Sequence, residues 1–159
     1  MTMLAAVIER LRRLLPALWA GLLLGIAGLA TPAPMALLGK ADAGRVVGRI
    51  FLQEAWLSLA LALLLLAVER SRARRAAQRG QGSILSAEML LVLGTAFCTV
   101  LGYFVVQPLL AAARAGQGGM TFGQLHAVSL GLFGLKTVLV MVLAWRAARP
   151  QQVSPAPFS

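Results

Sequence analysis

The sequence predicts an all-α protein, a four-helix transmembrane bundle, and three observations support this fold class. Hydrophobic residues make up 59% of the 159 residues and charged residues only 13%, about half of the charged share in soluble domains. The apolar residues gather in four runs, each close to the roughly 20 residues that a spanning helix needs. Basic residues flank alternate ends of these runs, as in multi-pass membrane proteins.

At this length we expect one membrane domain, over residues 14–146. A cytoplasmic flank, 1–13, precedes it, and a tail, 147–159, follows. The tail has no apolar periodicity and is expected to be disordered. The four spans inside the membrane domain carry few or no charges, and they are expected at about 14–38, 50–68, 88–110 and 122–145.

Prolines and one acid refine the first two spans. Pro16 is expected in the first turn of the first helix, where its missing N–H costs nothing, and Pro32 is expected to end that helix. The second span reaches only roughly 28 Å at 1.5 Å per residue. Glu54, near its start, must therefore lie inside the bilayer or close to one face.

The distribution of lysine and arginine predicts the orientation. The N-terminal flank, the second connection and the C-terminal flank together hold ten of these residues, whereas the first and third connections hold four. Basic residues concentrate on the cytoplasmic side, so we expect a multi-pass protein of the bacterial cytoplasmic (inner) membrane with both termini in the cytoplasm. A signal peptide cleaved after Ala30 is the weaker alternative, because the apolar run is longer than such signals usually have.

Lys136 is the most informative residue, because a charge at the bilayer centre costs at least about 2.5 kcal/mol. It precedes Arg146 by ten residues, which places it roughly 15 Å from the inner boundary. Such a lysine should face the bundle interior, be paired or be neutral. Glu54 is the acid nearest to it in depth, and a lysine side chain that extends toward the outer face could meet it.

Other polar residues are expected at the outer half of the bundle. Arg45 and Arg49 are four residues apart and share a helical face, and Asp42 can cap that helix or pair with Arg45. His126 and Ser129 lie one turn apart. The candidate polar pocket, for an anion, a proton or a small polar solute, comprises Arg45, Arg49, Glu54, Gln107, His126, Ser129 and Lys136. The alternative is that these residues only fix helix register. The two interpretations are balanced for Glu54 and Lys136, and the structural one is favoured for Gln107, His126 and Ser129.

Small residues form stripes that predict close helix packing. Such stripes serve packing within a bundle or between copies of a chain, and we favour packing within the bundle. Gly94, Cys98 and Gly102 make a looser stripe in the third span. The two regular stripes, in the first and fourth spans, are Gly21, Gly25 and Gly28, and Ala127, Gly131 and Gly134.

Composition argues against several function classes. The chain has one cysteine and one histidine, which exclude an internal disulfide and a bis-histidine haem site. It lacks a glycine-rich phosphate loop and paired carboxylates, so we expect no enzyme, no cofactor and no metal.

The arginine-rich segment, 70–79, is expected to extend the second helix, which then ends at Gly80 and Gly82, and to contact anionic lipid. It has no interleaved aromatic residues, which argues against nucleic acid.

Three blocks carry a resemblance to a known family, and they read LWAGLLLGIAGLATPAPMALL, AGRVVGRIF and FGQLHAVSL. Over about Leu14 to Trp145 the chain resembles the bacterial domain of unknown function 4149, related to eukaryotic transmembrane protein 205. The resemblance implies a small protein of four membrane helices and no settled activity. Its members often have Gly and Asn where this chain has Ala127 and Phe133.

Two functions remain as expectations. The leading one is transport or tolerance of a small solute through an outward-facing polar pocket. The alternative is a structural or assembly subunit whose glycine stripes dock another membrane protein or a second copy of the chain.

Overall fold

The computed structural model describes residues 3–78, 80 and 85–149. Throughout these residues the elements are helical, and no strand occurs among them. Four helical stretches are long and apolar enough to cross a membrane. The predicted fold class, a four-helix transmembrane bundle, is therefore confirmed, and the protein is a small multi-pass membrane protein.

Two of the four stretches are regular α-helices and two contain a π-helical segment. The first stretch comprises α1 (Met3–Gly25), the π-helical η1 (Ile26–Ala30) and α2 (Pro32–Leu37). The second is α3 (Lys40–Gln78). The third comprises α4 (Ala87–Thr99), the π-helical η2 (Val100–Val106) and α5 (Gln107–Arg114), and the fourth is α6 (Phe122–Ala148).

The helices extend beyond the apolar runs that predicted them. Because α1 begins at Met3, Pro16 lies within the helix and not in its first turn, so that expectation is wrong. Pro32 likewise begins α2, and the chain stays helical to Leu37. The arginine-rich segment does continue the second helix, to Gln78, and Gly80 follows with φ +69°.

Two expectations fall where no structure is described. Gly82 lies outside the described residues, and so do residues 150–159 of the tail that was expected to be disordered. Ala147 and Ala148, which open that tail, belong to α6.

Each π-helical segment precedes a proline, which explains its position. A proline has no N–H to donate, and its ring clashes with the carbonyl four residues earlier in a regular helix. Widening the preceding turn relieves that clash. The backbone N–H of Thr31, just before Pro32, accordingly donates to Ile26 O, five residues back, at 2.9 Å. Pro108 follows η2 in the same way.

Each helix of the bundle has two adjacent helices. Helix α1 packs against α6 and α3, and α4 packs against the same two helices. Helices α3 and α6 therefore lie on a diagonal. In the described part of the chain no Cα atom of α3 lies within 8 Å of a Cα atom of α6, and the two helices meet through side chains such as Phe51 and Phe133, whose ring centres are 5.4 Å apart. Large side chains fill the core, and its fully buried members include Trp19, Leu23, Leu65, Val92 and Val140.

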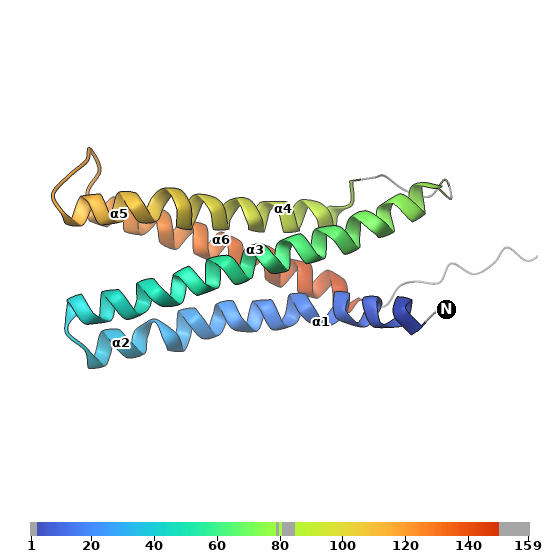
Figure 1. Ribbon diagram of the computed structural model, residues 1–159, viewed down its shortest axis with the longest axis horizontal. Helices are drawn as coiled ribbons and strands as arrows, with labels where there is room; N and C mark the ends of the chain where they lie inside the picture. Colours follow the sequence, from blue (N-terminus) through green and yellow to red (C-terminus); the bar gives the residue numbers. More distant parts are fainter. Residues whose placement is uncertain (1–2, 79, 81–84, 150–159) are drawn as a thin grey trace, which may run out of the picture.

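At one end, which we call the open end, the bundle divides in two. The open end carries the 38–39 and 115–121 connections, opposite the N-terminus (Figure 1). There α2 packs on α3 and α5 packs on α6. Among the described residues, no Cα atom of η1 or α2 lies within 8 Å of α6, and none of α5 lies within 8 Å of α3, measured between Cα atoms. We call the other end, with the start of α1, the closed end.

The two regular stripes of small residues do not pack helices within the bundle, so the interpretation that we favoured is wrong for them. A Cβ placed on Gly21, Gly25, Gly28, Gly131 or Gly134 would meet no atom within 4 Å, and Ala127 is exposed. Close approaches occur instead in the looser stripe, where a Cβ on Gly94 would lie 3.2 Å from Leu139 Cδ1. Spacing alone identifies a stripe but not the direction it faces.

The core predicts a contrast between two leucines. Leu23 is 0% exposed and Leu63 is 69% exposed. We expect Leu23→Ala to lower the free energy of unfolding by about 2–5 kcal/mol, because it leaves a cavity, and Leu63→Ala to change it by less than about 0.5 kcal/mol. Thermal unfolding of the purified protein in mild detergent measures both. Equal losses would contradict the placement of the core.

Candidate functional site

A buried ion pair lies across the diagonal of the bundle. Glu54 of α3 and Lys136 of α6 are each 4% exposed. Lys136 Nζ donates to both carboxylate oxygens of Glu54, at 2.7 Å to Oε1 and 2.8 Å to Oε2. The pairing that depth made possible is present, and it links the two helices on the diagonal of the bundle.

A second helix contributes to holding the carboxylate in place. The hydroxyl of Ser58, one turn after Glu54 on α3, donates to Glu54 Oε1. Trp19 Nε1 of α1 donates in turn to Ser58 Oγ at 3.0 Å. Sequence reasoning missed Ser58 and Trp19. The i, i+4 spacing of Glu54 and Ser58 was the available signal, since it places both residues on one helical face.

These contacts explain how the membrane interior tolerates two charges. A buried ion pair is stable only when the remaining polar atoms are also satisfied, and here the carboxylate accepts from Lys136 and Ser58. The ammonium also lies 5.0 Å from the centre of the Phe133 ring, a favourable cation–π distance. Within the described residues only Glu54 accepts from Lys136, through two hydrogen bonds, so the third N–H of the ammonium has no hydrogen-bond acceptor there.

A cavity of about 430 Å³ extends from this ion pair toward the open end. Its volume falls within the range that holds a drug-sized molecule. The walls come from η1 and α2, from the first half of α3, from η2 and α5, and from α6. Both π-helical segments therefore form part of the wall. Much of the wall is apolar or aromatic, and it includes Phe51, Tyr103, Leu110, Leu130 and Phe133.

The mouth of the cavity is cationic and aromatic. Arg114, at the end of α5, places its Cζ 4.9 Å from the centre of the Phe122 ring. The His126 ring stacks on the same ring at 5.7 Å. No ion pair involves Arg114 within the described part of the chain, so its charge remains available. Phe122 therefore orients both groups beside the opening.

The cavity brings together five of the seven residues predicted for the pocket. Glu54, Gln107, His126, Ser129 and Lys136 all line it. Counted in residues along their helices, Ser129 and Gln107 lie between the mouth and the ion pair. His126 is exposed at the mouth.

Arg45 and Arg49 do not line the cavity, and their assignment to the pocket is wrong. Both are exposed, and Arg45 pairs with Asp42 as expected. At about 100° per residue, they point roughly 180° and 140° away from Glu54 around α3. Gly44 and Gly48 occupy the cavity face of this helix instead.

Sequence reasoning also missed residues of the wall. Arg114 was counted only for topology, although it lies at the mouth. Thr31 lines the cavity, and its buried Oγ1 has no hydrogen-bond partner among the residues that the structure describes. No local spacing marks Arg114 or Thr31, because their places in the wall depend on how the two π-helical segments position the helices.

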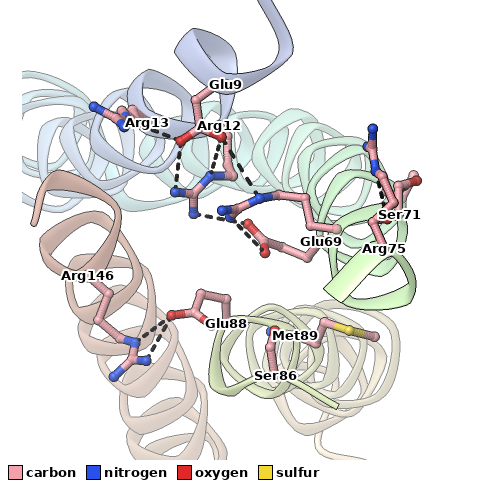
Figure 2. A network of polar contacts seen from close by, with 12 residues as sticks. Glu9, Arg12, Arg13, Glu69, Ser71, Arg75, Ser86, Glu88, Met89 and Arg146 are labelled. Atoms are coloured by element: carbon pink, nitrogen blue, oxygen red, sulfur yellow. Dashed lines mark hydrogen bonds and ion pairs between the residues drawn. The ribbon is translucent and has the colours of Figure 1, made fainter. Parts of the chain in front are cut away.

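The closed end is held by ion pairs (Figure 2). Arg12 of α1 is 7% exposed and bonds to Glu69 Oε1 of α3 at 3.3 Å and to Glu9 Oε1 at 3.1 Å. Arg72 joins both acids, with Nη1 3.6 Å from Glu69 Oε2. A separate pair, Arg146 Nη2 and Glu88 Oε1 at 2.8 Å, links α6 to α4.

The fold and the cavity together define a small multi-pass membrane protein of four helices with a polar-floored cavity. The sequence profile of the family described as Domain of unknown function (DUF4149) matches residues 14–118. That is more than half of the chain, so the protein belongs to this family. No curated protein and no solved structure matches it significantly.

The ion pair predicts a strong thermodynamic coupling. Breaking a buried pair by removing one partner typically costs about 3–5 kcal/mol, while replacing both partners can be nearly neutral. We expect Lys136→Met or Glu54→Gln alone to lower the unfolding temperature sharply, and the double variant to recover much of the loss.

The matched control is the partly exposed pair of Glu88 and Arg146, which also joins two helices. A double-mutant cycle there should give a coupling of at most about 1 kcal/mol. Thermal unfolding in detergent of both sets measures the difference. Additive losses at Glu54 and Lys136 would contradict a direct pair.

Proposed function

We propose that the protein binds a small solute in this cavity and acts in its transport or tolerance. The observation that carries the proposal is the floor of the cavity, where a buried ammonium has an N–H free for a ligand. A purely structural salt bridge needs no adjoining volume of about 430 Å³. Ionisable groups inside a membrane are by default candidates for a functional site.

The charge distribution supports an orientation for this site. With ten basic residues in the N-terminal flank, the second connection and the C-terminal flank, both termini are proposed to lie in the cytoplasm of a bacterium. The open end then faces outward from the inner membrane, so the cavity lies in the outer half of the bundle. The closed end, with its ion pairs, is then cytoplasmic.

The two ends favour transport over simple storage. Transporters expose a midplane site alternately to the two sides of the membrane. Here the site opens at one end, while ion pairs such as Arg12 with Glu69 hold the other. Ion pairs can exchange partners without opening a void in the hydrophobic core. We therefore propose that the closed end is the part of the bundle that moves to expose the site to the other side of the membrane.

We propose binding and not catalysis. Glu54 is the only acid among the described residues that line the cavity. It already accepts from Lys136 and Ser58, so the cavity offers no free carboxylate as a general base.

Gly48 provides the variant that tests solute binding. It lines the cavity, and a Cβ there would meet no atom within 4 Å. We expect Gly48→Leu to fold normally and to fill the cavity. Gly131→Leu is the matched control, because Gly131 is equally free of contacts and does not line the cavity.

The measurement is the shift in unfolding temperature of the purified protein with chloride, phosphate, benzoate and single-chain carboxylates. At least one probe should stabilise the wild type and Gly131→Leu, and it should stabilise Gly48→Leu by far less. The solute proposal fails if no probe stabilises the wild type, or if Gly48→Leu responds as strongly.

The second candidate function is a structural or assembly subunit. The specific observation for it is that five glycines, Gly21, Gly25, Gly28, Gly131 and Gly134, leave helix faces uncovered within the chain. Such faces allow close helix contact with a homo-oligomer or another membrane protein. If Gly131→Leu abolishes a complex recovered in mild detergent while Gly48→Leu leaves it intact, this function is favoured.

The arginine-rich end of α3 is proposed to contact anionic lipid. Arg70, Arg74 and Arg75 are exposed there, and each basic residue near an anionic surface contributes about 1 kcal/mol. We propose no nucleic-acid partner for this segment.

The orientation itself is testable at two connections. A reporter enzyme fused after Gly80 should be active only in the cytoplasm, and one fused after Gly118 only outside it. Alkaline phosphatase and a cytoplasmic fluorescent reporter measure the two cases. The reverse pattern would mean that the cavity opens to the cytoplasm.

A further inference from the structure

The cavity also opens sideways, between η1–α2 and α6. In the described part of the chain no Cα atom of η1 or α2 lies within 8 Å of a Cα atom of α6. Residues on both sides of the gap, Ala27 and Leu130, line the cavity and are exposed.

Other sides of the cavity are closed by side chains. Trp56 of α3 and Phe104 of η2 meet edge to face at 5.6 Å. A Cβ on Gly102 of η2 would lie 3.7 Å from Leu132 of α6, so these two segments are in close contact. At the depth of η2, the sideways opening therefore lies between η1–α2 and α6.

The gap lies at the depth of the hydrocarbon layer. Leu130 precedes Lys136 by six residues, which is about 9 Å along a helix. Ala27 lies in the uncharged run that crosses the membrane in the first stretch. A molecule that passes between these two residues therefore comes from the lipid and not from the aqueous loops.

The charges around the cavity favour an anionic head group on such a molecule. Lys136 is neutralised by Glu54, the only acid among the lining residues described. Arg114 at the mouth has no such partner there, and it stands at the end of its span, where lipid head groups lie. An anionic group beside Arg114 would gain a charge-assisted hydrogen bond.

The apolar wall and the volume of the cavity favour a ligand with one hydrocarbon chain. Phe51, Tyr103 and Phe133 offer an apolar surface between the mouth and the ion pair. A volume of about 430 Å³ corresponds to a drug-sized molecule. A single hydrocarbon chain or its equivalent suits this space better than a lipid with two chains.

We propose that the ligand is a single-chain anionic amphiphile that enters from the membrane through the gap between α2 and α6. Its head group lies beside Arg114 and its chain lies along the aromatic wall. This inference rests on the proposed function, because it names the class of solute that the same cavity takes.

The test uses the full-length protein in nanodiscs and a single-chain polyene carboxylate that fluoresces when bound. Leu130→Trp narrows the gap, and Leu135→Trp is its control, being exposed on the same helix but outside the cavity. Arg114→Gln removes the cation, and Arg45→Gln is its control, being exposed near the same end.

We expect the two controls to bind the probe as the wild type does. Arg114→Gln should bind it about tenfold more weakly, the effect of losing one charge-assisted contact. Leu130→Trp should slow its association about tenfold, because a narrowed route changes the rates of entry and exit and not the equilibrium affinity. The corresponding polyene alcohol, which lacks the charge, should bind weakly to every form. Equal binding of alcohol and carboxylate, or an unchanged affinity in Arg114→Gln, would overturn the anionic head group.

Two further outcomes separate this inference from the proposed function. If Leu130→Trp binds the probe as Leu135→Trp does, with the same association rate, the sideways route is wrong. If the polyene carboxylate fails to bind but benzoate or phosphate still stabilises the wild type and not Gly48→Leu, the amphiphile is wrong and the solute site stands. If neither class of probe responds, both proposals fail.

Discussion

One ionic contact determines how this bundle can be arranged. Helices α3 and α6 lie on a diagonal, too far apart for their backbones to pack closely, and side chains join them: Glu54 and Lys136 through two hydrogen bonds, with Phe51 against Phe133 beside them. Neither charge is tolerable alone in hydrocarbon, so the two helices must stay in register at this depth. Because the pair fixes the diagonal at its midpoint, the bundle can remain open beyond it without losing its alignment.

Prolines and glycines shape the cavity at the open end. Pro32 and Pro108 each force a widened turn before them, and the two π-helical segments form facing parts of the cavity wall. Gly44 and Gly48 then leave that space empty on the α3 side. At both glycines a Cβ would meet nothing within 4 Å. Backbone packing therefore does not require glycine here, whereas an unfilled cavity does.

The sequence predicted the features that depend on composition and on the depth of a residue in the membrane. It did not predict the direction in which a given helical face points. The four helices and the meeting of Glu54 with Lys136 follow from counting residues along apolar runs. Arg45, Arg49 and the regular glycine stripes were misplaced because periodicity defines a face without saying which way it turns. Arg114 and Thr31 were missed because their positions depend on where two π-helical segments bring the helices, which local spacing does not encode.

The family match adds a constraint on the fourth helix. Matched residues 14–118 contain Glu54, Arg114 and both π-helical segments, while Lys136 and His126 lie beyond them. A carboxylate buried as Glu54 is needs a counter-charge from somewhere in the bundle. No other basic side chain in the described residues lies within ion-pair distance of Glu54. The fourth helix must therefore supply the cation that makes the matched part of this chain stable, and it contributes the floor of the cavity as a consequence.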